Sequence, residues 1–278
     1  MEHISKVLDD ICQQEVKPIK TGIPYLDETI GGYYPGEMTT ICGEENCCKT
    51  AFVIHQLCKI AIGEKVPTLL LLNYMLERNF LSSMIAYYYS IEVRNLHDIF
   101  EKEQYKDIVA NFMSILKESP LYIMKAGWYE DTPVFERIVS FVETKNVKMM
   151  FVDETILDLT VEYTAKKRCM RDIAVEKNIP VIVTGCIWCD CAIPLLSDLG
   201  KSSYLHGHDE VISFTNYEDK CIFVDEQGND LHDTISIKVL NHRGMIKKET
   251  HCIPKPFFFF RNFDTVRDER LPVFSDIN

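Results

Sequence analysis

Short apolar runs alternate with amphipathic stretches along the first two thirds of this chain, and they predict alternating strands and helices. Continuous apolar runs of about five residues are typical of strands that are buried on both faces. Such runs occur at 38–42, 68–72, 121–124, 148–152 and 180–184. Helical spacing between them predicts helices over 49–62, 133–144 and 161–177, and two or three helices within 77–117. This alternation implies an α/β fold with a mainly parallel sheet and helical crossovers.

The pattern changes after residue 210, where β-type runs are separated by turn residues. These runs cover 210–215, 220–226, 233–241, 248–253 and the phenylalanine-rich segment 257–263. They predict antiparallel strands that extend the parallel sheet at its C-terminal end. We interpret the phenylalanine run as a strand with core and edge side chains, although a base-stacking platform is an alternative.

The N-terminal segment has a pattern of its own. Apolar residues at Ile4, Val7, Leu8 and Ile11 fall on one face of a helix, which ends at Lys17-Pro18. This amphipathic helix is either a cap packed on the main domain or a docking arm. The segment is charged and lacks a continuous apolar region, so we do not interpret it as a signal peptide.

Composition adds only a little to this picture. The 278 residues are 46% hydrophobic, which is enough for the core of one large domain, and no apolar run is long enough for a transmembrane helix. Eleven cysteines without an export signal suggest reduced thiols in a cytoplasm. The net charge of −12 argues against a broad nucleic-acid-binding face but leaves room for a small local patch.

The segment MTTICGEENCCKT, at 38–50, has the outline of a phosphate-binding loop, G-x-x-x-x-G-K-[ST]. Backbone N–H groups at the helix N-terminus and the Lys49 ammonium would neutralise phosphates, and the Thr50 hydroxyl would reach Mg²⁺. Asp153, at the end of a separate buried strand, would complete the metal shell. The pattern therefore predicts ATP and Mg²⁺ as cofactors. The candidate cofactor-binding residues are Gly43, Asn46, Cys47, Cys48, Lys49, Thr50 and Asp153, with Thr50 and Asp153 as metal ligands.

Two features of this loop depart from the motif. Cys48 replaces the second glycine, at a cost of about 1–2 kcal/mol if a left-handed conformation is required there. Glu44 and Glu45 add negative charge where phosphates would bind. We interpret these two as solvated loop charges, with a catalytic pair as the alternative.

Nearly the whole chain, from about residue 2 to 262, resembles the C-terminal RecA-like ATPase domain of the DnaB-type replicative helicases. The run TGIPYLDETIGGYYPGEMTTICG is similar to that family's TG-hydrophobic-x-x-LD-x-x-x-x-G-x-x-x-G-(D/E) lead-in to the phosphate loop. Pro194 with Leu196-Ser197-Asp198-Leu199 matches its P-x-x-SDL run, and 235–243 resembles the strand that ends in its K-Q-R triplet. The resemblance implies a linker-type helix at 1–18, a RecA-like domain at 19–265 and a tail at 266–278.

The resemblance also implies roles for individual residues. Arg243 would be an arginine finger that acts across a subunit interface, and Gly200, Lys201 and Ser202 would lie in the DNA-contacting loop. The family's catalytic glutamate falls at Met75, with Glu77 two residues later as a possible substitute. The glutamine that ends the 180–186 strand falls at Cys186, and the trans-acting lysine falls at Asn241. Because loss of a general base costs about 10²- to 10⁴-fold in rate, these departures predict impaired hydrolysis.

Three functional hypotheses remain open from the sequence. The first is a DnaB-helicase-like ATPase in DNA replication or mobile-element DNA metabolism, in a homo-oligomer or with a ring partner, with single-stranded DNA as a possible ligand and no membrane association. The second is a non-hydrolysing pseudo-ATPase that serves as a ring component, adaptor or inhibitor. The third is a RecA-like recombinase or clock-type ATPase, which the SDL run disfavours.

A second cluster contains residue types that suit zinc. Cys186, Cys189 and Cys191 are followed by His206 and His208, although the spacing departs from paired C-x-x-C knuckles. The main interpretation is that these are small apolar thiols. By topology, Cys186 should lie at the same sheet edge as Cys47 and Cys48.

Overall fold

The computed structural model describes most of the chain. The described residues are 3–13, 16–73, 75–91, 96–125, 134–153, 170–187, 208–224, 228, 230, 232, 234–244 and 250–254. The predicted strand at 257–263 and the tail at 266–278 lie outside them.

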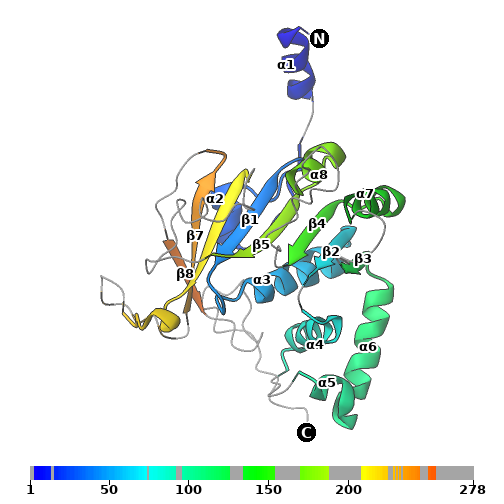
Figure 1. The fold of residues 1–278 in the computed structure, drawn as a ribbon, viewed down its shortest axis with the longest axis vertical. Coiled ribbons are helices and arrows are strands. Elements are labelled where there is room, and N and C mark those ends of the chain that lie inside the picture. The colour runs from blue at the N-terminus through cyan, green and yellow to red at the C-terminus, as the bar shows by residue number, and fades with distance from the viewer. Residues whose placement is uncertain are drawn as a thin grey trace.

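One sheet organises the described part of the chain (Figure 1). Its eight strands have the order β3-β2-β4-β5-β1-β6-β7-β8. The strands are β1 (Met38–Gly43), β2 (Thr68–Leu72), β3 (Leu121–Lys125), β4 (Met149–Asp153), β5 (Val181–Cys186), β6 (Glu210–Asn216), β7 (Thr234–His242) and β8 (Thr250–Pro254). The five strands predicted before residue 210 are confirmed with small shifts at their ends, and all of them pair in parallel.

Alternate residues of the central strands face two separate cores. On one face, Leu70 and Phe151 pack with Phe52 of the helix that follows the phosphate loop. On the other face, Leu71 and Val152 pack with a second layer of helices. Because both faces are covered, nearly every residue of β1, β2, β4 and β5 is buried, which explains their unbroken apolar runs.

The helices divide between these two layers. The first layer contains α2 (Pro24–Ile30), α3 (Lys49–Gln56), the π-helix η1 (Leu57–Gly63), α4 (Glu77–Tyr88), α5 (Asp98–Glu101), the 3-10 helix η2 (Glu103–Tyr105) and α6 (Lys106–Lys117). The second contains α7 (Val134–Lys145) and α8 (Met170–Lys177). The predicted helix over 49–62 is therefore half α-helix and half π-helix, and the part of the helix predicted before Met170 lies outside the described residues.

The lead-in before β1 forms a hydrogen-bonded turn. Asp27 accepts hydrogen bonds from the backbone N–H groups of Thr21 and Gly22, at 2.8 and 3.0 Å. The Thr21 carbonyl accepts from the Gln56 amide of α3 at 3.0 Å, and the Tyr33 hydroxyl donates to the same amide side chain at 3.2 Å. The turn thus ties the entry of β1 to the helix that leaves the phosphate loop.

The strands after residue 210 differ from prediction in two respects. The predicted antiparallel pairing is confirmed for β6 with β7 and for β7 with β8, but β6 also pairs in parallel with β1, so the parallel part of the sheet extends one strand further than predicted. No continuous strand forms over the described part of 220–226. Lys220 ends the 3-10 helix η3 (Glu218–Lys220), and Val224 makes only an isolated bridge to Asp230. The turn residues of this acidic segment leave too few consecutive apolar positions for a buried strand.

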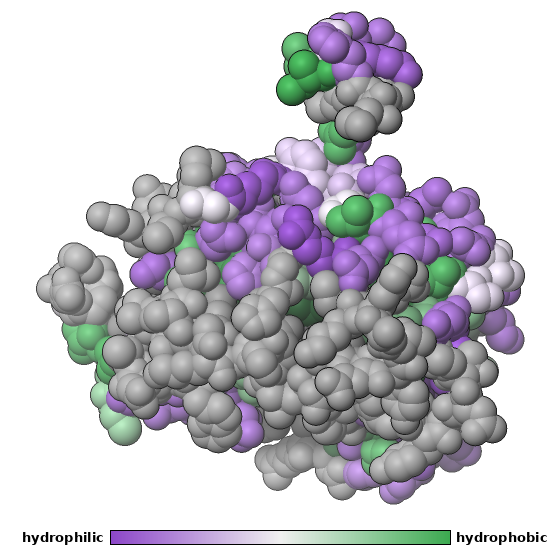
Figure 2. All heavy atoms as spheres, turned by 45° about the horizontal axis from the view of Figure 1, so that its top comes forward, coloured by the Kyte–Doolittle hydropathy of each residue, from purple (hydrophilic) through white to green (hydrophobic). Residues whose placement is uncertain are grey.

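Helix α1 (Ile4–Gln13) projects from the body (Figure 1). Figure 2 shows an apolar patch on this helix, where Ile4 and Leu8 are 80% and 58% exposed. Because Ile4 and Leu8 are open to solvent, the described side chains of α1 do not form the cap packed on the main domain that the sequence pattern offered as one alternative. Within the described residues, no helix combines the length and apolar character that crossing a bilayer requires.

Candidate nucleotide-binding site

The phosphate loop lies where β1 ends, between the ends of β5 and β6. Gly43 pairs with Cys186 in the parallel ladder, as the sequence predicted for that edge. A Cβ at Gly43 would collide with the Phe214 carbonyl oxygen of β6 and with the Cys47 Sγ. Only glycine therefore fits at the point where the chain leaves the sheet.

Two loop residues occupy the left-handed region. Asn46 has φ 59°, which its short amide tolerates, and Cys48 has φ 66° and ψ 24° immediately before α3. The position that is glycine in the motif therefore does require a left-handed backbone. The predicted conformational cost of Cys48 applies in this structure.

Replacing Cys48 tests this strain. We expect Cys48→Gly to be more stable than Cys48→Ala by about 1 kcal/mol, because both variants remove the thiol and only glycine lacks the Cβ that strains a left-handed backbone. Chemical denaturation of both variants measures the difference. As a matched control, Ala51→Gly in the right-handed helix α3 should be destabilised by about 1 kcal/mol. Equal stability of the two Cys48 variants would contradict a strained loop.

Lys49 is folded into the loop. Its side chain is 5% exposed, and its ammonium donates to the carbonyl oxygens of Glu44 at 2.6 Å and Gly43 at 3.2 Å. The Cys47 Sγ lies 3.5 Å from the same nitrogen. The loop carbonyl oxygens accept the N–H groups of the ammonium that a phosphate would otherwise bind. These hydrogen bonds also hold the ammonium at the loop.

The thiols around Lys49 are compatible with a protonated lysine. Burial raises the pKa of the Cys47 thiol, more than the neighbouring Lys49 lowers it, which favours the neutral thiol. The pKa of Lys49 is raised from its ordinary value: burial lowers it, but the sulfur atoms of Cys47 and Cys186, which accept hydrogen bonds from the ammonium, raise it by more. Among the residues described, no group of three metal-ligating side chains comes together. Cys189, Cys191 and His206 lie outside the described residues.

Thr50, in the first turn of α3, and Asp153, at the end of β4, meet although they lie far apart in the sequence. The Thr50 hydroxyl lies 3.4 Å from both carboxylate oxygens of Asp153, and the Thr184 hydroxyl donates to one of them at 3.2 Å. Asp153 is only 2% exposed. A buried carboxylate beside a threonine hydroxyl at a helix N-terminus is a donor set that fits Mg²⁺ held against phosphates.

The candidate catalytic glutamate has a basic neighbour. Glu77 begins α4, at the sheet edge that carries the phosphate loop, and its carboxylate pairs with the Lys125 ammonium at 3.3 Å. Both side chains are about half exposed. Met75, at the family's glutamate position, packs against the core. The Glu77 carboxylate is thus engaged by a lysine in this structure.

Arg243 lies at the opposite edge of the sheet. The antiparallel pairing of Glu210 with His242 places the end of β7 beside the start of β6, and β6 runs parallel to β1. Arg243 therefore lies at the edge where β1 begins, away from the phosphate loop of its own chain. A role for this residue at a nucleotide requires the nucleotide of another subunit.

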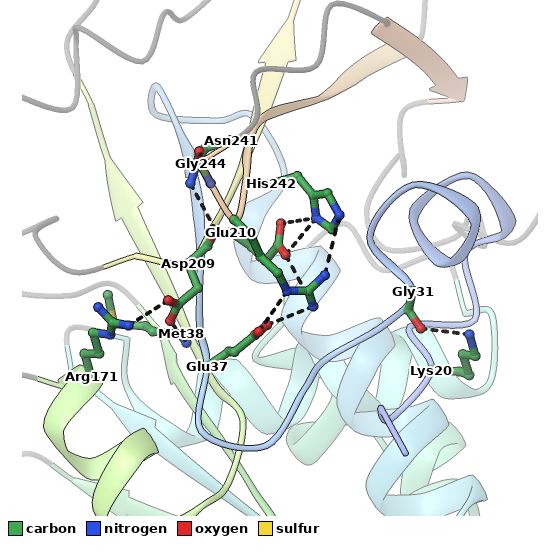
Figure 3. A network of polar contacts seen from close by, with 11 residues as sticks. Lys20, Gly31, Glu37, Met38, Arg171, Asp209, Glu210, Asn241, His242 and Gly244 are labelled. Atoms are coloured by element: carbon green, nitrogen blue, oxygen red, sulfur yellow. Dashed lines mark hydrogen bonds and ion pairs between the residues drawn. The ribbon is translucent and has the colours of Figure 1, made fainter. Parts of the chain in front are cut away.

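The Arg243 guanidinium is held by a polar network that includes Glu37, Glu210 and His242, the three partners labelled in Figure 3. It donates to both oxygens of Glu37, at 2.8 and 3.0 Å, and stacks on Tyr34 with 4.3 Å from its central carbon to the ring centre. Glu210, which is 1% exposed, lies 3.6 Å away and pairs with His242 at 2.8 Å. The Glu37 hydrogen bonds raise the pKa of Arg243, so its charge is fixed.

The sequence did not predict one ion pair at the loop. The Lys220 ammonium, from η3, lies 2.6 Å from a carboxylate oxygen of Glu44. Sequence reasoning noted the negative charge of Glu44 but had no signal for its partner, because the two residues come from separate parts of the chain. Gly200, Lys201 and Ser202, the predicted DNA-contacting residues, lie outside the described residues.

Comparisons with known proteins agree on the family. The model of the DnaB-like helicase C terminal domain matches residues 18–250. The chain is similar to the replicative DNA helicase DnaB of Treponema pallidum (strain Nichols), with 21% identity over 214 residues, which is 73% of this chain and 48% of that protein. This chain therefore spans about half the length of that relative.

Solved structures support the same fold. A DnaB-like replicative helicase, whose structure was described with its interactions with primase, superposes with a TM-score of 0.66 at 16% identity, over 91% of this chain and 65% of the other. A second solved structure, of a separate ATPase domain, also gives 0.66 at 16% identity, over 90% and 92% of the two chains. The predicted RecA-like α/β fold is thereby confirmed. Because the family model covers most of its length, this chain belongs to the DnaB-like helicase C-terminal domain family.

Proposed function

We propose that this chain is a DnaB-type ATPase domain that binds ATP with Mg²⁺, hydrolyses it slowly, and acts in DNA replication or mobile-element DNA metabolism. The observation that supports binding is the juxtaposition of Lys49, Thr50 and Asp153 at one end of the sheet. Lys49 would hold phosphate oxygens, and Thr50 with Asp153 would hold the metal. When bound, Mg²⁺ supplies charge neutralisation for the phosphates.

Slow hydrolysis is expected because the residues at the positions that would activate water are not suited to that role. A thioether at Met75 cannot orient or deprotonate water, and Glu77 pairs with Lys125. Asn241, at the position of the trans-acting lysine, carries no charge, and its amide donates to the Asp209 carbonyl oxygen at 3.0 Å. The residues that bind nucleotide are thus retained while those that activate water are replaced.

Assembly into a ring is part of this proposal. Arg243 is charged, partly exposed and far from its own phosphate loop, so it would reach a nucleotide only on an adjacent subunit. The exposed apolar face of α1, with Ile4 and Leu8, would dock on a neighbouring subunit. Single-stranded DNA would contact the loop that contains Gly200, Lys201 and Ser202.

A second candidate function is a non-hydrolysing ring component, adaptor or inhibitor. The specific observation in its favour is that Glu77 and Arg243 are both held in ion pairs, with Lys125 and Glu37 respectively. In this case the nucleotide would be a structural ligand, and the family's subunit surfaces would be the functional part of the molecule.

Calorimetry and a DNA-stimulated ATPase assay test the proposal together. We expect MgATP to bind at millimolar concentration or below, and turnover to stay below about 0.1 s⁻¹, because a typical enzyme turns over at about 10 s⁻¹ and a missing general base costs at least about 10²-fold. Binding without any turnover would favour the second candidate. Absence of ATP and ADP binding at millimolar nucleotide with Mg²⁺ would refute the cofactor assignment.

A further inference from the structure

The negative charge of Glu44 is a problem for any phosphate ligand at this loop. Glu44 follows Gly43 directly, and its own backbone carbonyl accepts a hydrogen bond from the Lys49 ammonium at 2.6 Å. Its side chain is 29% exposed, so solvent screens its charge only partly. An uncompensated carboxylate at this place would repel a triphosphate that Lys49 must attract.

Lys220 compensates this charge from a separate element. Its ammonium lies 2.6 Å from the Glu44 carboxylate and is 23% exposed. The ion pair is therefore less screened than an ordinary surface pair, whose contribution is small. The pair also fixes the direction in which the Glu44 side chain points.

The backbone places Lys220 firmly beside the loop. It ends η3, where its N–H donates to the Tyr217 carbonyl oxygen at 3.0 Å, and the Ile222 N–H donates to the same oxygen at 3.0 Å. The preceding strand β6 pairs with β1, and the Phe214 carbonyl oxygen lies so close to Gly43 that a Cβ there would collide with it. The start of the phosphate loop and the segment that contains Lys220 thus form one packed unit.

We propose that Lys220 is a positioning residue of the nucleotide site, which keeps the Glu44 carboxylate paired and directed away from the phosphates. Lys220 acts through Glu44 and does not itself bind the phosphates. The inference rests on the proposed binding of ATP, and it adds a regulatory property: any contact that draws Lys220 from Glu44 lowers affinity for nucleotide.

The test measures dissociation constants of MgATP, MgADP and AMP by calorimetry for the wild type, Lys220→Ala, Glu44→Ala and the double variant. We expect Lys220→Ala to weaken MgATP binding about tenfold, MgADP binding less and AMP binding least, because repulsion grows with phosphate charge. In the Glu44→Ala background the same lysine substitution should change affinity less than about twofold, because the repelling charge is absent. Lys220→Gln, which keeps more of the side chain, should repeat the alanine result.

Lys177→Ala provides the matched control. The substitution removes an ion pair, between Lys177 and Glu143 at 2.6 Å, and it changes the net charge by the same amount as Lys220→Ala. It lies at the end of α8, which precedes β5, and therefore at the sheet edge opposite the phosphate loop. The nucleotide affinity of the Lys177→Ala variant should equal that of the wild type.

Four outcomes separate the possibilities. Rescue of Lys220→Ala by Glu44→Ala, together with a graded dependence on phosphate number, supports the positioning role. Equal weakening by Lys220→Ala in both backgrounds overturns it and makes Lys220 a direct phosphate ligand. A wild type that binds no nucleotide refutes the proposed function itself and the inference with it, whereas wild-type binding that is insensitive to Lys220 refutes the inference alone.

Discussion

Replacing Lys49 with alanine is expected to weaken MgATP binding by about 100-fold. The ammonium is buried at the loop, where it bonds the carbonyl oxygens of Gly43 and Glu44. Exchange of these neutral acceptors for phosphate oxygens would create charge-assisted hydrogen bonds, each worth about 1.5–3 kcal/mol. A factor of ten corresponds to about 1.4 kcal/mol, so loss of one or two such bonds gives this effect.

Calorimetric titration of the folded variant measures this loss, with circular dichroism as the check on folding. Lys177→Ala, which removes the same charge at the opposite sheet edge, should bind MgATP like the wild type. Any slow, DNA-stimulated turnover of the wild type should disappear in Lys49→Ala. Unchanged affinity in Lys49→Ala would show that ATP binds elsewhere on the molecule.

The second large effect concerns Asp153. We expect Asp153→Asn to lose the Mg²⁺ dependence of ATP binding, with affinity in the presence of the metal reduced about 10- to 100-fold. The Asp153 side chain is 2% exposed, and its carboxylate lies between the hydroxyls of Thr50 and Thr184. Its negative charge is therefore confined to the region beside these two hydroxyls. An amide of the same shape keeps an oxygen acceptor but removes the charge that holds a hard divalent cation.

Titrations with and without excess chelator measure this dependence. In the wild type, chelation of Mg²⁺ should weaken ATP binding, and in Asp153→Asn it should make little further difference. Asp172→Asn, on the exposed side of α8, removes an equal charge away from the site and should retain the wild-type response. A full Mg²⁺ response in Asp153→Asn would exclude this carboxylate from the metal shell.

The residues that depart from the family pattern still fit the backbone and the packing at their positions. Cys48 keeps the left-handed backbone that the motif's glycine would adopt without strain. Met75 keeps its place against the core, and Asn241 keeps a hydrogen bond in the network beneath Arg243. The backbone and packing are thus kept at positions where the residue type departs from the family pattern, and the proposed separation of nucleotide binding from hydrolysis rests on this observation.

Much of the fold could be predicted because its signals are local. Thr68–Leu72 is a strand with the predicted bounds, since a short continuous run such as its four leucines is typical of a strand that is covered on both faces. Cys48 was identified from spacing alone, because steric limits on φ apply within a single residue. Register and direction were less accessible, and β6 pairs in parallel because its place beside β1 depends on the path of the whole chain.

The order of residues was enough to predict the alternating strands and helices, the loop between β1 and α3, and the types of residue that could bind a nucleotide. Which charges meet became known from the folded structure. Lys220 pairs with Glu44, Glu77 with Lys125, and Arg243 with Glu37 at the far edge of the sheet. The reason is physical: an apolar pattern acts through local backbone geometry, whereas an ion pair between distant segments exists only after the sheet has brought their side chains together.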